Sequence, residues 1–531
     1  MPLDTQIEPS TPLVSAASAR KTLGAKIIRS VSFGALRYVL LAPIPFVMTP
    51  FILHKIGVAG YGTWAVFLAI NSLTSMADLG LVGTLSKFVA EHHAHGDFAG
   101  LSRLLSSALG LFLILAFTAA IVMGGISHVL ITALFRGTTT PLPELMVLLR
   151  FFLIVIVANV LILLLSSVVS GLQRLDITYI MSAANILLSA LGSAALLLQG
   201  WGLRGLVYAY SFSAVITLIG YVVVTRKLLP EVSLNPFRFE VTEARRMLGF
   251  SLRLYVIQAA AGIYNQLDKT FLALLIGVAP VGWFDIASDV AVKVRAVVGL
   301  MLGPVLPAAS ELNALHDEQR TKELYYRTQK YLALIGIPVV VCANAFTARF
   351  IKLWLGPSMS MVALPMSILI TVGFINLASG PGFLIFAGRG YLKPAIQSCT
   401  LGIVLNVIVS LALIYKFGFA GAAIGTATAI TVSALFLIWK FHQESGYPVA
   451  RLIRESYIKP TVCALASIEA VRAFPLVKTV TWPGFVLDVL AFGSAYASLI
   501  LMSQFFDAYD WSKIESFLPA ARYAKRIIWN A

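Results

Sequence analysis

The sequence is poor in charge, and this scarcity limits the class of protein that it can encode. Only 12% of its 531 residues are charged, whereas 59% are hydrophobic and the mean hydropathy is +0.87. Soluble domains carry about 25% charged residues. A soluble globular enzyme of this length is therefore excluded, because it would lack the polar surface that water requires.

Cysteine is also scarce, and the sequence has no cofactor motif. The three cysteines, Cys342, Cys399 and Cys463, all fall in apolar segments without the spacing of a disulfide framework or a metal site. We therefore expect no cofactor and no metal. Residues 1–25 also lack an apolar core of signal-peptide type, so we expect an uncleaved first span behind a disordered, cytoplasmic tail.

What the sequence has instead is a series of apolar runs, each about twenty residues long, the length at which a helix crosses a bilayer. The runs are continuously apolar rather than alternating, so they predict helices and not a barrel. We expect an all-α polytopic membrane protein with about fourteen transmembrane helices. The predicted spans are 31–53, 60–82, 104–130, 146–170, 178–199, 203–225, 248–275, 282–304, 329–353, 363–387, 392–415, 419–440, 457–474 and 483–505. The last two are the weakest, because Glu469 and Asp488 interrupt them.

Lysine and arginine set the predicted orientation. They cluster on one side of the spans, for example at Arg20–Lys21, Arg245–Arg246 and Lys525–Arg526, and are sparse on the other side. Positive loops face the cytoplasm. We therefore predict a multi-pass protein of the bacterial inner membrane with both termini in the cytoplasm. Because the net charge of +16 follows this topology, it does not indicate a nucleic-acid partner. The last residues, with Trp511 and Trp529 among arginines and lysines, fit either an interfacial segment or a solvated tail.

The two halves of the chain resemble each other. Ile56-Gly57-Val58-Ala59 with Gly62 recurs as Ile276-Gly277-Val278-Ala279 with Gly282, Gly202 and Gly205 recur as Gly418 and Gly421, and Phe33, Tyr38 and Val39 recur as Phe250, Tyr255 and Val256. Such a parallel repeat predicts two six-helix lobes with a substrate cleft between them, and alternating access by rocking. The predicted parts are a tail (1–27), an N-lobe (28–225), a linker (226–247), a C-lobe (248–440), two further spans (441–505) and a tail (506–531).

Charged residues inside the predicted spans are expensive, so each needs a reason. Arg37 and Arg253 occupy similar places in the first and seventh spans. They fit either a cationic pair that faces the cleft or side chains that extend to the inner interface. Asp268 and Lys269 are adjacent and therefore point to different helix faces.

The eighth span holds a further set of charges. Asp285, Asp289 and Lys293 follow a four-residue spacing, so Lys293 is expected to neutralise Asp289. Lys293 and Arg295 lie roughly 15–20 Å deep and fit either a cleft lining or structural ion pairs. Basic residues are in excess, which favours an anionic, phosphate-bearing substrate. We take Arg37, Arg253, Lys269, Lys293 and Arg295 as candidate substrate-binding residues, and Asp268, Asp285 and Asp289 as candidate ion-coupling residues.

Short glycine-rich motifs then suggest a family. The segments Gly57-Val-Ala-Gly60-Tyr61-Gly62-Thr63-Trp64, Asp78-Leu79-Gly80-Leu81 and Lys87-Phe-Val-Ala-Glu91 resemble the Wzx-type polysaccharide repeat-unit flippases of the MOP superfamily. Residues 277–287, Asn406 and Gly418-Phe-Ala-Gly421-Ala-Ala resemble their second half. The resemblance implies ion-driven movement of undecaprenyl-diphosphate-linked oligosaccharide to the outer leaflet. The partners implied are this lipid, the bilayer, and polysaccharide polymerase and chain-length machinery.

Four other functions stay open. A multidrug exporter of the same superfamily tends to place acids in the lobe cores to take up cations, whereas the first span here carries Arg37 and no acid. A peptidoglycan-precursor flippase would share the mechanism, but this chain does not show the arginine-aspartate start usual in that family. A polymerase or ligase would require a sizeable outer loop, which the predicted spans do not leave. A passive channel would not explain two lobes with an asymmetric set of charges.

Overall fold

The computed structural model describes residues 41, 43–75, 81–232, 235–236, 238–473 and 480–517, without the side chains of 73–75, 250, 252–265 and 513–517. This part of the chain is helical and contains no strand. Ten of its helices are long and apolar enough to cross a membrane. The prediction of an all-α polytopic membrane protein is therefore confirmed.

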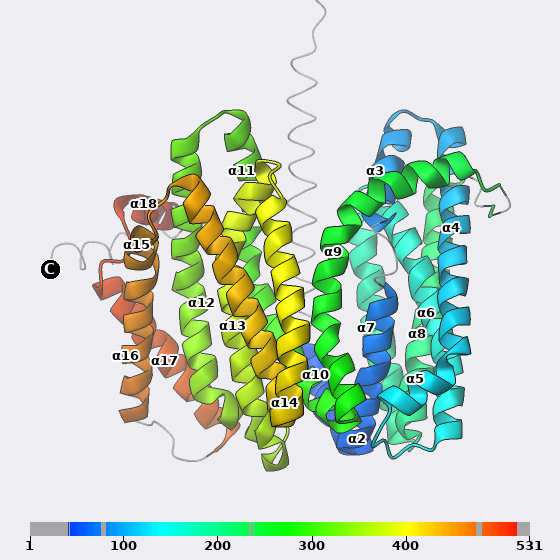
Figure 1. The fold of residues 1–531 in the computed structure, drawn as a ribbon, viewed down its shortest axis with the longest axis horizontal. Helices are drawn as coiled ribbons and strands as arrows, with labels where there is room; N and C mark the ends of the chain where they lie inside the picture. The colour runs from blue at the N-terminus through cyan, green and yellow to red at the C-terminus, as the bar shows by residue number, and fades with distance from the viewer. Residues whose placement is uncertain are drawn as a thin grey trace, which may run out of the picture. The chain divides into compact units, whose positions relative to one another are not determined.

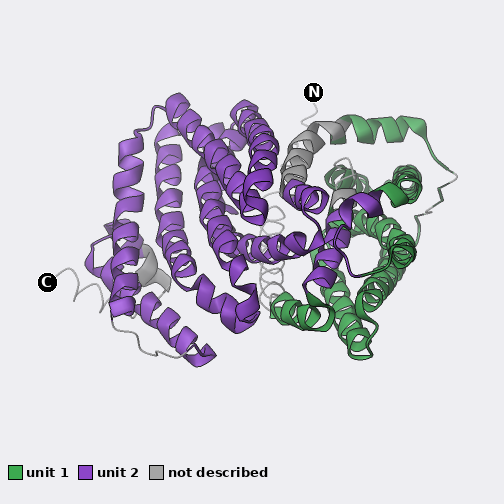
Figure 2. Ribbon diagram, turned by 60° about the horizontal axis from the view of Figure 1, so that its bottom comes forward, with its two compact units in different colours: residues 1–57, 71–129, 140–256 green, residues 58–70, 130–139, 257–531 purple. Residues whose placement is uncertain are grey.

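The chain divides into two compact units (Figure 2). Unit 1 comprises the described residues within 1–57, 71–129 and 140–256, and unit 2 those within 58–70, 130–139 and 257–531. Three of the described helices run from one unit into the other along the chain: α2 (Pro43–Ser75), α5 (Ser127–Leu134) and α9 (Val241–Leu275).

Unit 1 is a bundle in which α6 is central. It packs against α3, α4, α7 and α8, and α7 also packs along α8. A core of fully buried leucines and phenylalanines on α3, α4 and α6 holds the bundle together. The helices are α3 (Leu81–Ala94), α4 (Phe98–Gly125), α5 (Ser127–Leu134, which continues into unit 2), α6 (Leu142–Gly171), α7 (Leu175–Leu198) and α8 (Gly202–Leu228).

Unit 2 is built around α13, which packs against α10, α11, α12 and α14 (Figure 1). On the other side of α12, α16 and α17 form a second layer. The helices are α10 (Val278–Gly299), α11 (Val305–Ala314), α12 (Glu318–Trp354), α13 (Ala363–Gly388), α14 (Lys393–Ser445), α15 (Val449–Leu452), α16 (Ile458–Ala473), α17 (Trp482–Met502) and α18 (Ala508–Phe517), with 3₁₀ turns at Leu300–Leu302 and Pro357–Val362 and a π-helical turn at Ile453–Tyr457.

The helix pattern agrees with about fourteen spans once two breaks are counted. Helix α2 is interrupted at Gly57 and α14 at Gly418, so each joins two predicted spans. The first predicted span begins outside the described residues. Helix α9 is not among the ten because polar and charged residues interrupt its apolar stretch, and α16 is not among them because it is only 16 residues long.

The repeated glycines mark equivalent breaks in the two halves. Gly57 has a φ of 69° and a ψ of 177°, and Gly277, at the same place in the second half, has a φ of 126° and a ψ of −175°. These angles suit glycine and strain any other residue. Arg136 secures the second break, because its carbonyl accepts from the N–H of Val278 at 2.9 Å.

The acids that weakened the prediction of the last two spans have basic partners. Asp488 on α17 is buried and ion-paired with Arg349 of α12, and Glu469 pairs with Arg472 one turn along α16. Trp511, expected at an interface or in solvent, is instead 3% exposed and packs on Phe506 with ring centroids 6.0 Å apart. The start of α18 is thus part of the folded unit.

Candidate functional site

Three neighbouring groups of polar residues lie within unit 2, on α2, α9, α10, α13 and α14. For two of the predicted candidates the structure does not describe the side chain. Arg37 lies outside the described residues, and Arg253 lies on α9 in a stretch without described side chains. The other six candidates fall into these three groups.

The first group surrounds Asp268 on α9. This carboxylate is 2% exposed and accepts hydrogen bonds from Thr426 Oγ1 at 2.5 Å, Ser410 Oγ at 3.0 Å and Asn406 Nδ2 at 3.3 Å, all on α14. The break at Gly418 lets α14 present Asn406 and Ser410 from one segment and Thr426 from the other. A buried carboxylate is thereby held by three neutral donors.

One buried hydrogen-bond acceptor in this group lacks a donor among the described residues. Asn406 is fully buried, and while its amide nitrogen donates to Asp268 and Ser410, its Oδ1 oxygen has no hydrogen-bond partner within the described structure. Leaving a buried acceptor unmatched costs about 1–3 kcal/mol. An oxygen of this kind beside a carboxylate and two hydroxyls is the donor set that suits a small hard cation.

The second group joins α9 to α10 and α2. Lys269 Nζ lies 2.5 Å from Asp285 Oδ1, and Tyr61 donates its hydroxyl proton to Asp285 Oδ2 at 3.1 Å. Asp285 is 8% exposed. Adjacent residues Asp268 and Lys269 therefore serve different groups, as their positions on different helix faces predict.

The glycines of the repeat allow α2 and α10 to pack closely enough for the contacts of this second group. A Cβ on Gly62 would lie 1.9 Å from the carbonyl oxygen of Val278, and a Cβ on Gly282 would lie 3.0 Å from Cα of Gly62. The Val58–Ile70 stretch of α2 thus crosses the start of α10 with backbones in contact, and Tyr61 reaches Asp285. Small residues at helix crossings are how membrane bundles obtain close packing.

The third group lies further along α10. Lys293 is ion-paired with Asp289, as the four-residue spacing predicts, and Arg295 Nη1 is 3.5 Å from the amide oxygen of Asn376 on α13. Lys293 is 22% exposed and Asp289 is 47% exposed, so this pair is more accessible than Lys269–Asp285.

A cavity of about 60 Å³ connects the first and third groups. Asp268 and Arg295 both line it, although 27 positions and a helix break separate them. The other lining residues are Phe284, Ser288, Ala291, Val292, Leu369, Gly373, Thr426 and Ile430. The structure thus brings one candidate acid and one candidate base to the same space.

Sequence reasoning missed the residues that complete these groups. Tyr61, Asn376, Ser410 and Thr426 were not among the candidates, and Asn406 was noted only as part of a motif. A signal was present, because Asn406 and Ser410 are polar residues four apart in an apolar span, which places both on one helix face. Their partner on another helix could not be read from spacing.

The fold and the intramembrane polar groups define a multi-pass helical membrane transporter. Residues 27–313, more than half of the chain, match the polysaccharide biosynthesis protein family, and the chain belongs to this family. The prediction from the sequence of a repeat-unit flippase of the MOP superfamily is thereby confirmed at the level of the family.

Curated relatives agree with this assignment. The chain is 21% identical over 433 residues to the putative O-antigen transporter of Shigella flexneri, covering 78% of this chain and 97% of that protein. It is 21% identical over 461 residues to the probable flippase AglR of Haloferax volcanii, covering 86% and 91%. A further match, 24% identical to the uncharacterized membrane protein MJ1068 of Methanocaldococcus jannaschii, spans 56% of that protein.

Solved structures share the fold. The lipid II flippase MurJ in an inward closed conformation aligns with a TM-score of 0.69 at 13% identity, covering 87% of this chain and 98% of MurJ. An inward-facing multidrug resistance MATE family transporter of the MOP superfamily aligns with a TM-score of 0.60 at 16% identity, covering 76% and 94%. At these identities the likeness concerns the fold alone.

Proposed function

We propose that this protein is a flippase that moves undecaprenyl-diphosphate-linked oligosaccharide repeat units from the inner to the outer leaflet of a bacterial inner membrane. The observation that carries the proposal is sequence similarity over 97% and 91% of the length of two proteins named as an O-antigen transporter and a flippase. The transported units then supply polymerase and chain-length machinery for a surface polysaccharide. Transport proceeds by alternating access.

We assign the diphosphate to the exposed end of the third polar group. Arg295 has a neutral hydrogen-bond partner in Asn376, and its guanidinium can bind two phosphate oxygens at once. Lys293, paired with the half-exposed Asp289, is a second cation two residues before Arg295 on α10. Lys269 is a weaker candidate, because Asp285 already neutralises it in a buried pair. Arg37 and Arg253 stay candidates from their predicted depth alone.

We assign ion coupling to Asp268. Its carboxylate, the orphan Asn406 Oδ1 and the hydroxyls of Ser410 and Thr426 offer ligands for either a proton or a sodium ion. The cavity shared with Arg295 gives this ion a way to influence the substrate site. Asp285 and Asp289 are weaker candidates for coupling, because each is ion-paired with a lysine.

The proposal is tested in a deletion strain complemented with variants. Cells with an intact inner membrane are first treated with an enzyme added from outside, which acts only on lipid-linked oligosaccharides in the outer leaflet. The polyprenyl-linked oligosaccharides are then extracted, and the fraction that the enzyme did not reach is assigned to the inner leaflet. We expect complete repeat units to accumulate on the cytoplasmic face with loss of surface polymer, and Lys293→Ala/Arg295→Ala to reproduce the defect at normal protein level. Arg320→Ala, an exposed arginine at the start of α12, is the matched control and should restore export.

Three results would contradict parts of this assignment. Normal glycan export with altered sensitivity to cationic dyes would assign the chain to the drug exporters instead. Single repeat units on the outer face would indicate loss of a polymerase. In proteoliposomes, Asp268→Asn that retained full dependence on both proton and sodium gradients would refute the coupling role of Asp268.

A further inference from the structure

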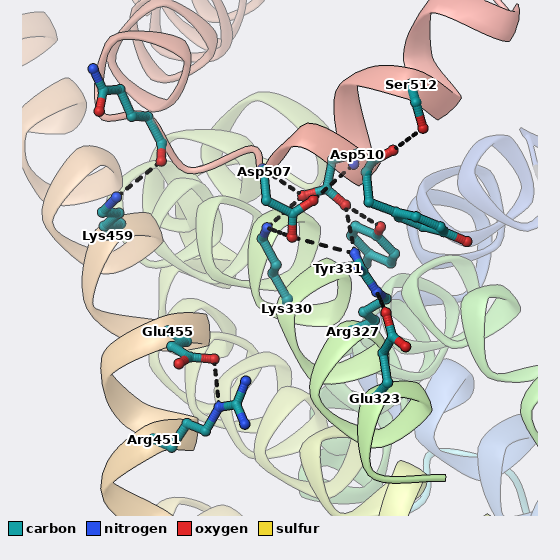
Figure 3. Close-up of polar contacts among 12 residues, drawn as sticks. Glu323, Arg327, Lys330, Tyr331, Arg451, Glu455, Lys459, Asp507, Asp510 and Ser512 are labelled. Carbon is teal, nitrogen blue, oxygen red and sulfur yellow. Dashed lines mark hydrogen bonds and ion pairs between the residues drawn. The ribbon is translucent and has the colours of Figure 1, made fainter. Parts of the chain in front are cut away.

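A large basic pocket lies in unit 2, away from the three polar groups, between α12, the π-helical turn with α16, and the segment before α18 (Figure 3). Its volume is about 840 Å³, within the range of small-molecule sites. Basic residues outnumber acidic ones in its lining by six to three. The basic residues are Lys322, Arg327, Lys330, Arg451, Arg454 and Lys459.

Part of this charge is used to hold the C-terminal segment. Arg327 and Lys330 of α12 bind Asp510, which is 3% exposed, at 3.3 Å and 2.5 Å. Asp507 and Asp510 accept each other's backbone N–H at 2.9–3.0 Å, a reciprocal cap that starts α18. Arg327 and Lys330 are therefore mostly structural, and they form one wall of the pocket.

The opposite wall carries charge that no carboxylate offsets. Arg451 pairs with Glu455 at 2.9 Å, but Arg454 and Lys459 have no acidic partner among the residues that the structure describes. Lys459 donates to the neutral carbonyl of Gln504 at 3.0 Å. Both side chains are exposed, so their ammonium and guanidinium groups are available to an anion.

A buried hydroxyl in the lining also has no partner. Ser456 is 1% exposed, lines the pocket, and its Oγ makes no hydrogen bond within the described structure. Because an unmatched buried hydroxyl costs free energy, its position beside two uncompensated cations indicates an acceptor supplied from outside the chain. A phosphate oxygen meets that need.

The surface that continues from the pocket is apolar. Along α16, Ile458, Val462 and Leu465 are spaced at i, i+4 and i+7 and are 48–59% exposed, so they form one outward stripe that starts next to Lys459. A basic head region followed by an apolar stripe matches the profile of a phospholipid, with the headgroup above and acyl chain below. A soluble anion would occupy the basic pocket and leave the apolar stripe uncovered.

We propose that this pocket binds the headgroup of an anionic phospholipid, with Arg454, Lys459 and Ser456 on its phosphate and one acyl chain along Ile458, Val462 and Leu465. The predicted topology places the pocket at the cytoplasmic side, where membranes are most anionic and basic pockets between helices take phospholipid headgroups. This site is separate from the proposed transport site. Its occupancy stabilises the junction between α12, α16 and the C-terminal segment.

The test is a titration of the purified full-length chain in detergent with phosphatidylglycerol, phosphatidylcholine, inorganic phosphate or pyrophosphate, read as the thermal midpoint of unfolding. We expect phosphatidylglycerol to raise the midpoint and the other three to leave it within error. Arg454→Glu/Lys459→Glu should weaken apparent phosphatidylglycerol affinity about tenfold or more. Arg472→Glu reverses an exposed arginine at the other end of α16, and it should leave that affinity unchanged.

Equal responses to phosphatidylglycerol and phosphatidylcholine, or a double variant that binds like the parent, would overturn the proposal. Stabilisation by phosphate or pyrophosphate equal to that by phosphatidylglycerol would replace the lipid by a soluble anion. Should the double variant unfold at a lower midpoint without lipid, Arg454→Gln serves instead. This single change removes an exposed charge on the same wall, and an unchanged affinity would likewise refute the site.

Discussion

Lys269 Nζ lies 2.5 Å from Asp285 Oδ1, and this buried pair ties α9 to α10 on the side where Tyr61 of α2 also reaches the carboxylate. Three helices thus meet at one charge pair, at the point where the repeated glycines bring backbones into contact. Charges in such a setting are held by their partners rather than by solvent. Breaking the pair should therefore lower the stability of the folded protein as well as its transport activity.

Replacing Lys269 by methionine should destabilise the protein by about 3–5 kcal/mol, because Asp285 would be left buried and without its counter-charge. The measurement is thermal or denaturant unfolding of the purified protein in detergent. Glu144→Gln is the matched control, since its partner Arg204 is 55% exposed, and it should cost under about 1 kcal/mol. A Lys269→Met loss as small as that of the control would show that the pair contributes little.

Replacing Thr426 by valine should destabilise unit 2 by about 1–3 kcal/mol, because Asp268 loses the donor at 2.5 Å. Thr428→Val on the same helix is the control. That hydroxyl is exposed and bonds only to the carbonyl of Ile424 among the contacts described, so the change should cost under about 0.5 kcal/mol. Equal losses for both variants would indicate a general effect of threonine on α14.

Replacing Gly62 by alanine should sharply reduce the amount of folded protein, because the new methyl group would lie 1.9 Å from the carbonyl oxygen of Val278. Backbone would have to move apart, and the Tyr61–Asp285 hydrogen bond would be lost with it. Gly493→Ala on α17 meets open space and is the control. The readout is monodisperse yield in size-exclusion chromatography, and a normal yield for Gly62→Ala would contradict the close crossing.

The docking of the C-terminal segment should weaken in acid. Burial alone would raise the pKa of Asp507, but the N–H of Asp510 and the charges of Lys330 and Arg327 outweigh it and hold the pKa below its usual 3.8. A lowered pKa means that the stabilisation is fully present above 3.8 and is lost as the pH falls through the lower value in the folded state.

The change can be followed through Trp511, which is buried next to this segment. Subtracting the emission spectrum of Trp511→Phe from that of the parent isolates the fluorescence of Trp511. This emission should shift toward that of an exposed indole as the pH falls below about 4. In Asp507→Asn the part of this transition caused by Asp507 should disappear. An identical pH profile in parent and Asp507→Asn would assign the transition to other groups.

The sequence predicted the helices well, because lipid imposes a length and a composition on every span. The predicted span 363–387 is the helix Ala363–Gly388, and 483–505 is Trp482–Met502. Gly57 and Gly277 both fall between predicted spans, and the structure breaks the helix at each, since a residue with no Cβ tolerates angles that others avoid. The pair Lys293–Asp289 was readable because both members lie on one helix.

Contacts between helices were not readable in this way. Nothing in the spacing of Lys269 and Asp285 shows that they meet, and nothing in Asp268 shows which of the polar residues of α14 surround it. Asp488 weakened the prediction of its span, because its partner Arg349 lies on another helix and could not be assigned beforehand.

The sequence by itself determined the class of protein, the number and type of spans, the internal repeat and the presence of costly charges in the membrane. These follow from local rules of hydropathy and helix period. Only the tertiary structure decided which charges on different helices neutralise one another, that Asp268 and Arg295 share a cavity, and that the C-terminal segment closes a basic pocket. Those facts depend on how helices cross, and a crossing is fixed by side chains that are distant in the chain.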